Sequence, residues 1–208
     1  MCRQALLSAL AGCSTRAGSR PSYADLFHHQ CILQVFFVAQ FASFQEEIVH
    51  KFSENILGEQ KLFCPDIYGD SKEPADIAWV TNRCAILMYM TESKKSFERK
   101  RDHNLKQLWR WLHVWKNGTP LIGISNTKRF EINFDDIDHI VGLSIIDGGE
   151  TKCQYHSDII RRSTNLKLSG CATITSSVIR EMASTGHGPR DIIFWLQEMR
   201  FLTFEQQM

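Results

Sequence analysis

Apolar residues return every three or four positions over residues 41–57, which predicts an amphipathic helix. The apolar positions are Phe41, Phe44, Ile48, Phe52 and Ile56. Gly58 follows directly, and glycine is a typical stop signal after a helix.

Two apolar segments further along predict a pair of strands joined by a tight turn. The first is Asp-Ile-Ala-Trp-Val at 76–80, and the second is Cys-Ala-Ile-Leu-Met-Tyr-Met-Thr at 84–91, with the turn at 81–83. The second segment is almost continuously apolar, so we expect it to be covered on both faces and central in its sheet. A short strand at 61–64 precedes the pair.

Residues 97–117 give the clearest helical pattern in the chain. Its expected buried stripe is Leu105, Leu108, Trp109, Leu112 and Trp115. Asn117-Gly118 ends the helix, and Pro120 lies just beyond. Trp111 falls off this stripe, so it is the tryptophan expected to be able to stack on a base.

Two more strands are expected at 121–125 and 137–146, and two closing helices at 173–184 and 190–202. The order of helix, hairpin, helix, strands and helices predicts an α/β domain. Its centre is a mixed β-sheet flanked by helices.

Length and charge narrow the class of protein. The 208 residues carry 24 basic and 23 acidic side chains, and 43% of them are apolar. These values predict a single domain over 26–208, preceded by a flexible leader at 1–25 that contains arginines and almost no acids. A net charge of +1 excludes a globally basic nucleic-acid coat but leaves room for a local basic patch.

The seven cysteines are odd in number and form no C-x-x-C pair. This pattern argues against a zinc ribbon and a secreted disulfide framework, and indicates reduced thiols in a cytoplasmic protein. The uncharged stretch 26–45 contains histidines and glutamines that are costly in lipid, so no membrane span is expected.

Charged residues gather at one end of the predicted hairpin. Folding the chain about 82–83 brings Asp76 opposite Tyr89 or Met90, about two residues from Glu92. Glu92 and Lys94 are two positions apart, so an extended chain points both to the same face. Charge clustered at the end of an apolar strand suggests a metal or a substrate phosphate, because isolated buried charge is costly.

This layout resembles the PD-(D/E)XK nuclease superfamily, which has the restriction-endonuclease-like fold. The motif residues are Pro74-Ala75-Asp76 and Glu92-Ser93-Lys94, at the start and end of the two strands. The family's leading helix carries a glutamate, here Glu46 or Glu47, with Glu46 preferred from the local pattern. Its following helix often carries a glutamine, here Gln107, and the next family strand matches 121–125. The resemblance covers about residues 41–126.

The resemblance implies a metal-dependent endonuclease that hydrolyses DNA phosphodiester bonds, in restriction, anti-phage defence or repair. Asp76, Glu92 and Glu46 would bind Mg²⁺ or Mn²⁺, while Lys94 would hold the attacking water or the pentavalent charge. Gln107 would support the site. A homodimer or a partner subunit is a further expectation by analogy. The alternative is a non-catalytic nucleic-acid-binding or assembly subunit that keeps the fold.

A basic stretch follows the motif and is expected to bind the DNA backbone. Besides Lys94, its members are Lys95, Arg99, Lys100, Arg101, Lys106 and Arg110, set against only Glu98 and Asp102. Arg161, Arg162 and Lys167 form a possible second patch.

Overall fold

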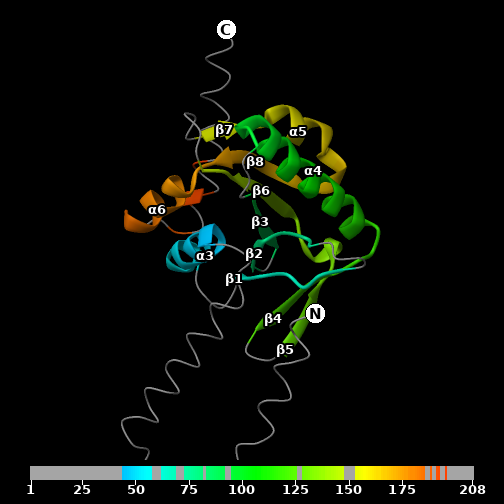
Figure 1. The fold of residues 1–208 in the computed structure, drawn as a ribbon. Coiled ribbons are helices and arrows are strands. Elements are labelled where there is room, and N and C mark those ends of the chain that lie inside the picture. The colour runs from blue at the N-terminus through cyan, green and yellow to red at the C-terminus, as the bar shows by residue number, and fades with distance from the viewer. Residues whose placement is uncertain are drawn as a thin grey trace, which may run out of the picture. The chain divides into compact units, whose positions relative to one another are not determined.

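Eight strands of the described chain fall into one six-stranded mixed sheet and one separate two-stranded hairpin (Figure 1). The computed structural model of the protein describes residues 44–57, 62–68, 73–81, 83–91, 95–125, 128–147, 153–185, 188, 191–192 and 195. All of them belong to one compact unit, residues 41–208. The expected leader at 1–25 lies outside the described residues.

The large sheet begins as an antiparallel meander and continues with parallel strands. Its order is β1 (Leu62–Phe63), β2 (Ile77–Thr81), β3 (Cys84–Met90), β6 (His139–Ile145), β8 (Leu168–Ile174) and β7 (Cys153–Tyr155). β1, β2 and β3 pair antiparallel, β3, β6 and β8 pair parallel, and β7 runs antiparallel to β8. The predicted mixed α/β class is confirmed, as are the hairpin and its central apolar strand.

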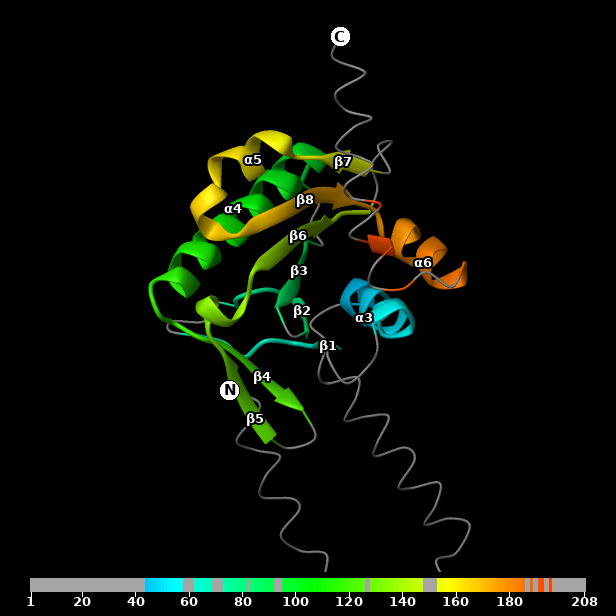
Figure 2. The ribbon, with the colours of Figure 1, turned by 180° about the vertical axis from the view of Figure 1, so that it is seen from behind.

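Helices cover both faces of the sheet (Figures 1 and 2). α3 (Phe44–Leu57) and α6 (Ser176–Ser184) pack on one face, and α4 (Phe97–Lys116) and α5 (Ser157–Arg162) pack on the other. Alternate residues of β3 divide between the two cores, with Met88 facing α3 and Leu87 facing α4. Within the described residues, no helix is both long and apolar enough to cross a membrane.

The expectation that 121–125 is a strand of the central sheet is wrong. β4 (Leu121–Ser125) pairs only with β5 (Lys128–Ile132), in a hairpin that projects from the β1 side of the sheet (Figure 1). The strand beside β3 is β6, which the expected segment 137–146 does contain. Both segments are short apolar runs, so the sequence pattern cannot tell which one pairs with β3. Phe130 fixes the hairpin elsewhere, because its ring packs edge-on against Phe63 at 5.0 Å.

The sequence did not predict the side of the sheet formed by β8 and β7. β7, β8 and α5 are unexpected, and the expected helix 173–184 starts too early. Thr173 and Ile174 end β8, and α6 begins only at Ser176. β8 reads Leu-Ser-Gly-Cys-Ala-Thr-Ile, whose small residues carry little strand signal, so its pairing with β6 decides its structure. The expected helix 190–202 lies largely outside the described residues.

The buried face of α4 is rotated relative to the expected stripe. Trp111 is only 1% exposed, whereas Trp109 is 36% exposed, which reverses their expected positions. The Trp111 ring packs on Tyr68 and Trp115, with ring centroids 4.7 and 6.1 Å away. These contacts come from outside the local pattern. The same happens in α3, where Val49 rather than Ile48 is fully buried.

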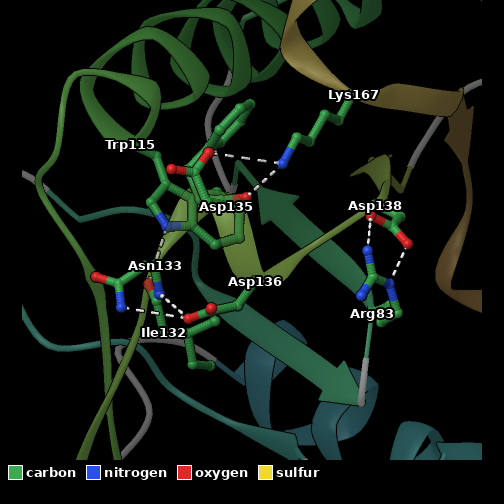
Figure 3. Close-up of polar contacts among 9 residues, drawn as sticks. Arg83, Trp115, Ile132, Asn133, Asp135, Asp136, Asp138 and Lys167 are labelled. Atoms are coloured by element: carbon green, nitrogen blue, oxygen red, sulfur yellow. Dashed lines mark hydrogen bonds and ion pairs between the residues drawn. The ribbon is translucent and has the colours of Figure 1, made fainter.

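Polar contacts fix the loops at the end of the sheet where β6 and β8 begin (Figure 3). Arg83 forms a bidentate ion pair with Asp138. The Lys167 ammonium donates to the backbone oxygen of Phe134 at 2.9 Å and lies over its ring. Lys167 also lies 3.9 Å from a carboxylate oxygen of Asp135. It therefore serves this loop, not an open basic patch with Arg161 and Arg162.

Candidate functional site

Asp76 lies immediately before β2 and is fixed to the end of β3. Its N–H donates to the Met88 oxygen at 3.0 Å, and its carboxylate accepts the N–H of Met90. The preceding turn is held by the Tyr89 hydroxyl, which donates to the Pro74 oxygen at 2.6 Å. The predicted placement of Asp76 opposite Tyr89 or Met90 is confirmed.

The electrostatic environment of Asp76 is unusual for a carboxylate. Burial, together with the charges of Glu46 and Glu73, raises its pKa to about 7. The hydrogen bond from Met90 acts in the opposite direction and does not outweigh burial. Because a partly buried negative charge beside two other acids is unfavourable, this position favours a bound proton or cation.

The two candidate glutamates of α3 differ in position. The Glu46 charge acts on Asp76, while Glu47 is exposed to solvent. Asp147, which follows β6, holds this end of α3: its carboxylate accepts the Gln45 amide at 3.2 Å. The same carboxylate accepts the N–H of Ser176 at 2.9 Å, at the start of α6. One side chain thus ties the beginnings of α3 and α6 to the end of β6.

Glu92 and Lys94 lie outside the described residues. The described part of β3 and its extension ends at Thr91, and the chain is described again from Lys95. Convergence of Asp76, Glu92 and Lys94 therefore stays a prediction. Its structural basis is that Met90, two residues before Glu92, is hydrogen-bonded to the Asp76 carboxylate.

Asn104 of α4 is the helix residue that contacts the end of β3. It is fully buried, and its amide donates to the Tyr89 oxygen at 3.1 Å and to the Ser144 hydroxyl at 3.0 Å. The Thr91 hydroxyl donates to its carbonyl oxygen at 2.5 Å. Sequence analysis missed Asn104. The available signal was its position four residues before Leu108, on the true buried stripe.

Gln107, the glutamine expected to support the site, lies three residues beyond Asn104. Its side chain is half-buried, and within the described part of the chain it makes no hydrogen bond. The polar support that the sequence placed on Gln107 is therefore supplied at β3 by Asn104, while a role for Gln107 toward Glu92 or Lys94 stays a prediction.

The basic residues after the motif fall into two groups. Lys95, Arg99, Lys106 and Arg110 are exposed, whereas Lys100 and Arg101 are half-buried. Arg101 donates to the Gln154 side chain of β7 at 3.3 Å and pairs with Asp102 at 2.8 Å. Four of the six candidate backbone-binding residues thus face solvent, and Arg101 already serves a contact within the fold.

A buried histidine lies near Arg101. His156 is 6% exposed, and its Nε2 forms a 2.8 Å hydrogen bond with the Thr173 hydroxyl. Burial, and to a smaller extent the Arg101 charge, lowers its pKa to about 4. Thr173 is the cross-strand neighbour of Ser144, so buried polar side chains run from Asn104 across β6 and β8 to His156.

The described residues contain two of the acidic side chains of the predicted metal site, Asp76 and Glu46. Among them, no group of three His, Cys, Asp or Glu side chains is arranged to hold a metal ion. Asp76 and Glu46 would provide two carboxylates, and a third ligand would have to come from the segment after Thr91, which is where Glu92 lies in the sequence.

Comparison with known proteins gives no match: no family model, curated protein or solved structure is similar to the chain at a significant level. The interpretation of the site therefore rests on its residues and their geometry.

Proposed function

We propose that the chain is a DNA endonuclease that depends on Mg²⁺ or Mn²⁺ and has a restriction-endonuclease-like core. The observation that carries the proposal is the position of Asp76. Its partly buried carboxylate accepts a hydrogen bond from Met90 and lies close enough to Glu46 for their charges to interact, and the chain continues from Met90 through Thr91 into Glu92-Ser93-Lys94.

The order of the elements supports this proposal. α3 is followed by the meander β1–β2–β3, then by α4, and, after the β4–β5 hairpin, by β6 parallel to β3. The resemblance implies the same succession of helix, hairpin, helix and strand, with β6 now taking the place first given to 121–125. Asp76 lies beside the C-terminal end of the central strand β3. The resemblance leads us to expect the family's motif residues at this strand end.

The donor set fits a magnesium-type ion. Carboxylate oxygens are the ligands that Mg²⁺ prefers, and a cation would offset the burial and the repulsion by Glu46 and Glu73 that raise the pKa of Asp76. Asp76 and Glu92 would hold the ion, with Glu46 completing the site. When bound, such an ion polarises the phosphate and lowers the pKa of a coordinated water.

The remaining residues would position the substrate and the reacting groups. Lys94 would hold the attacking water and stabilise the negative charge that develops around phosphorus. The exposed Arg99, Lys106 and Arg110 would contact the phosphate backbone. Asn104 acts indirectly, because it fixes the strand end from which Glu92 follows.

The test is cleavage of supercoiled plasmid by the full chain with Mg²⁺ or Mn²⁺, and with EDTA as the metal-free control. Wild type and the exposed-site control Glu47→Gln should nick the plasmid, whereas Asp76→Asn and EDTA should abolish nicking. A folded wild-type protein that binds DNA without cutting it would replace the proposal by the alternative, a non-catalytic nucleic-acid-binding or assembly subunit.

A further inference from the structure

The outward face of α4 carries an exposed tryptophan among basic residues. Within the described residues, Trp109 and Ile67 are the exposed large apolar side chains, at 36% and 50%. The Trp109 ring contacts the His113 ring, with centroids 5.1 Å apart and planes at 64°. An exposed indole keeps a flat apolar face in solvent that a planar ligand group could cover.

The charge around Trp109 has one sign. From residue 103 to residue 130 the chain contains no aspartate or glutamate. On α4 this stretch presents Lys106, Arg110 and Lys116 to solvent, at three residues before, one after and seven after Trp109. Residues three, four and seven apart lie on one side of a helix, so Lys106 and Lys116 flank the indole, and Arg110 extends this surface because it lies four residues after Lys106. Such a surface is complementary to a polyanion that also offers flat apolar groups.

We propose that this surface, defined as Lys106, Trp109, Arg110, His113 and Lys116, binds single-stranded DNA. A base stacks on Trp109, and the neighbouring phosphates contact the flanking cations. A duplex buries the faces of its bases in its own stack, so only a single strand or an unpaired end offers them to an exposed indole. The choice of DNA as the ligand rests on the proposed nuclease function.

The location of the surface fits a role in substrate choice. Asn104 contacts the end of β3, and Trp109 lies five residues further along α4, about 7.5 Å along the helix axis. A strand held at Trp109 therefore lies on the solvent face of the same helix whose buried face contacts the strand end next to Asp76. The proposed substrate class is DNA with a single-stranded segment next to the cleaved bond, such as a flap, a bubble or a frayed end.

The test measures equilibrium binding of the full chain in EDTA, so that no cleavage occurs. The fluorescent ligands are an oligo-dT 20-mer, an oligo-U 20-mer, a 20-bp duplex and a poly-glutamate peptide. Trp109→Ala should weaken oligo-dT binding roughly five- to hundredfold and change duplex binding less than about twofold, because one stacked base is lost. Trp109→Phe should retain most of the affinity, and the exposed control Ile67→Ala should bind as wild type does.

Four results would overturn the inference. They are unchanged oligo-dT binding by Trp109→Ala, equal losses on single strand and duplex, tighter binding of oligo-U than of oligo-dT, and binding of poly-glutamate in preference to oligo-dT. Plasmid cleavage separates this inference from the proposed function. Wild type that cuts plasmid but shows no Trp109 dependence overturns only the binding surface. Trp109-dependent oligo-dT binding by a protein that does not cut overturns only the nuclease.

Discussion

The side-chain amide of Asn104 donates to the backbone oxygen of Tyr89 at 3.1 Å, and thereby joins α4 to the end of β3. The same amide reaches Ser144 of β6 at 3.0 Å. A single buried side chain therefore links three elements next to Asp76. Because a buried polar group without a partner is costly, this link makes the position of the strand end specific.

Replacement of Asn104 should destabilise the fold. Asn104→Ala leaves the Tyr89 oxygen and the Ser144 hydroxyl without this partner and opens a cavity, so we expect a loss of about 2–4 kcal/mol in the free energy of unfolding. Gln107→Ala on the same helix is the matched control and should change it by under about 0.5 kcal/mol. Urea unfolding measures both, and equal effects of the two variants would contradict the role of Asn104.

Glu46 and Glu47 should differ in their effect on metal dependence. Glu46→Gln removes a charge that acts on Asp76, so the Mg²⁺ concentration for half-maximal plasmid cleavage should rise about ten- to hundredfold. Glu47→Gln changes an exposed neighbour and should leave that concentration unchanged. Measuring the cleavage rate at increasing Mg²⁺ concentrations gives this value for both variants. The assignment of Glu46 fails if Glu47→Gln has the larger effect.

Lys94 should be essential for cleavage. We expect Lys94→Ala to lower kcat at least about a hundredfold, since it removes a contact that stabilises the transition state. Lys95→Ala, at the exposed next position, should retain kcat and raise only the DNA concentration required. Single-turnover cleavage and circular dichroism measure rate and fold together. Full activity of a folded Lys94→Ala protein would remove this residue from the mechanism.

The salt dependence of DNA binding should show how many of the exposed basic residues contact phosphates. Neutralising Arg99, Lys106 and Arg110 together should reduce the slope of log K against log salt by up to about three units on duplex DNA, because each phosphate contact releases about one counterion. Arg101→Gln should reduce it much less, since Arg101 already contacts Gln154 and Asp102. Binding isotherms from low to moderate salt give the slopes, and an unchanged slope in the triple variant would place the DNA elsewhere.

His156 should make stability depend on pH. Its pKa is lowered to about 4 by burial in the folded protein, whereas the ordinary pKa of a histidine is 6.5. The unfolded chain therefore takes up a proton first, and the stabilisation present above pH 6.5 is lost as the pH falls toward 4. The loss amounts to about 3 kcal/mol at most. His156→Asn should flatten this part of the stability profile in urea unfolding between pH 4 and 7.

A second buried histidine, His50, should affect the pH dependence of stability in the same direction. Burial also lowers the pKa of His50 in α3 to about 4. His50→Asn should therefore flatten the profile further when combined with His156→Asn, because the two residues lie on opposite faces of the sheet and share no partner. A steeper profile in either variant would contradict the assigned direction.

The sequence by itself determined the features that depend on neighbouring residues. The two strands around residues 82–83, their pairing and the position of Asp76 opposite Tyr89 follow from apolar runs joined by a short turn, because a hairpin leaves few alternative registers. The same local logic gave the existence of α3 and α4. The convergence of Asp76 with Glu92 and Lys94 is expected from their spacing and stays a prediction, because Glu92 and Lys94 lie outside the described residues.

Only the tertiary structure decided the features that depend on distant partners. β6 rather than β4 pairs with β3, because competing apolar runs are distinguished by the surfaces they meet and not by their own pattern. β8 becomes a strand through burial beside β6. On α4, Tyr68 and Trp115 bury Trp111 and leave Trp109 in solvent, so the buried face differs from the expected one. The burial of Asn104 also depends on distant partners, because a polar residue is stable in a core only where groups from other elements satisfy its hydrogen bonds.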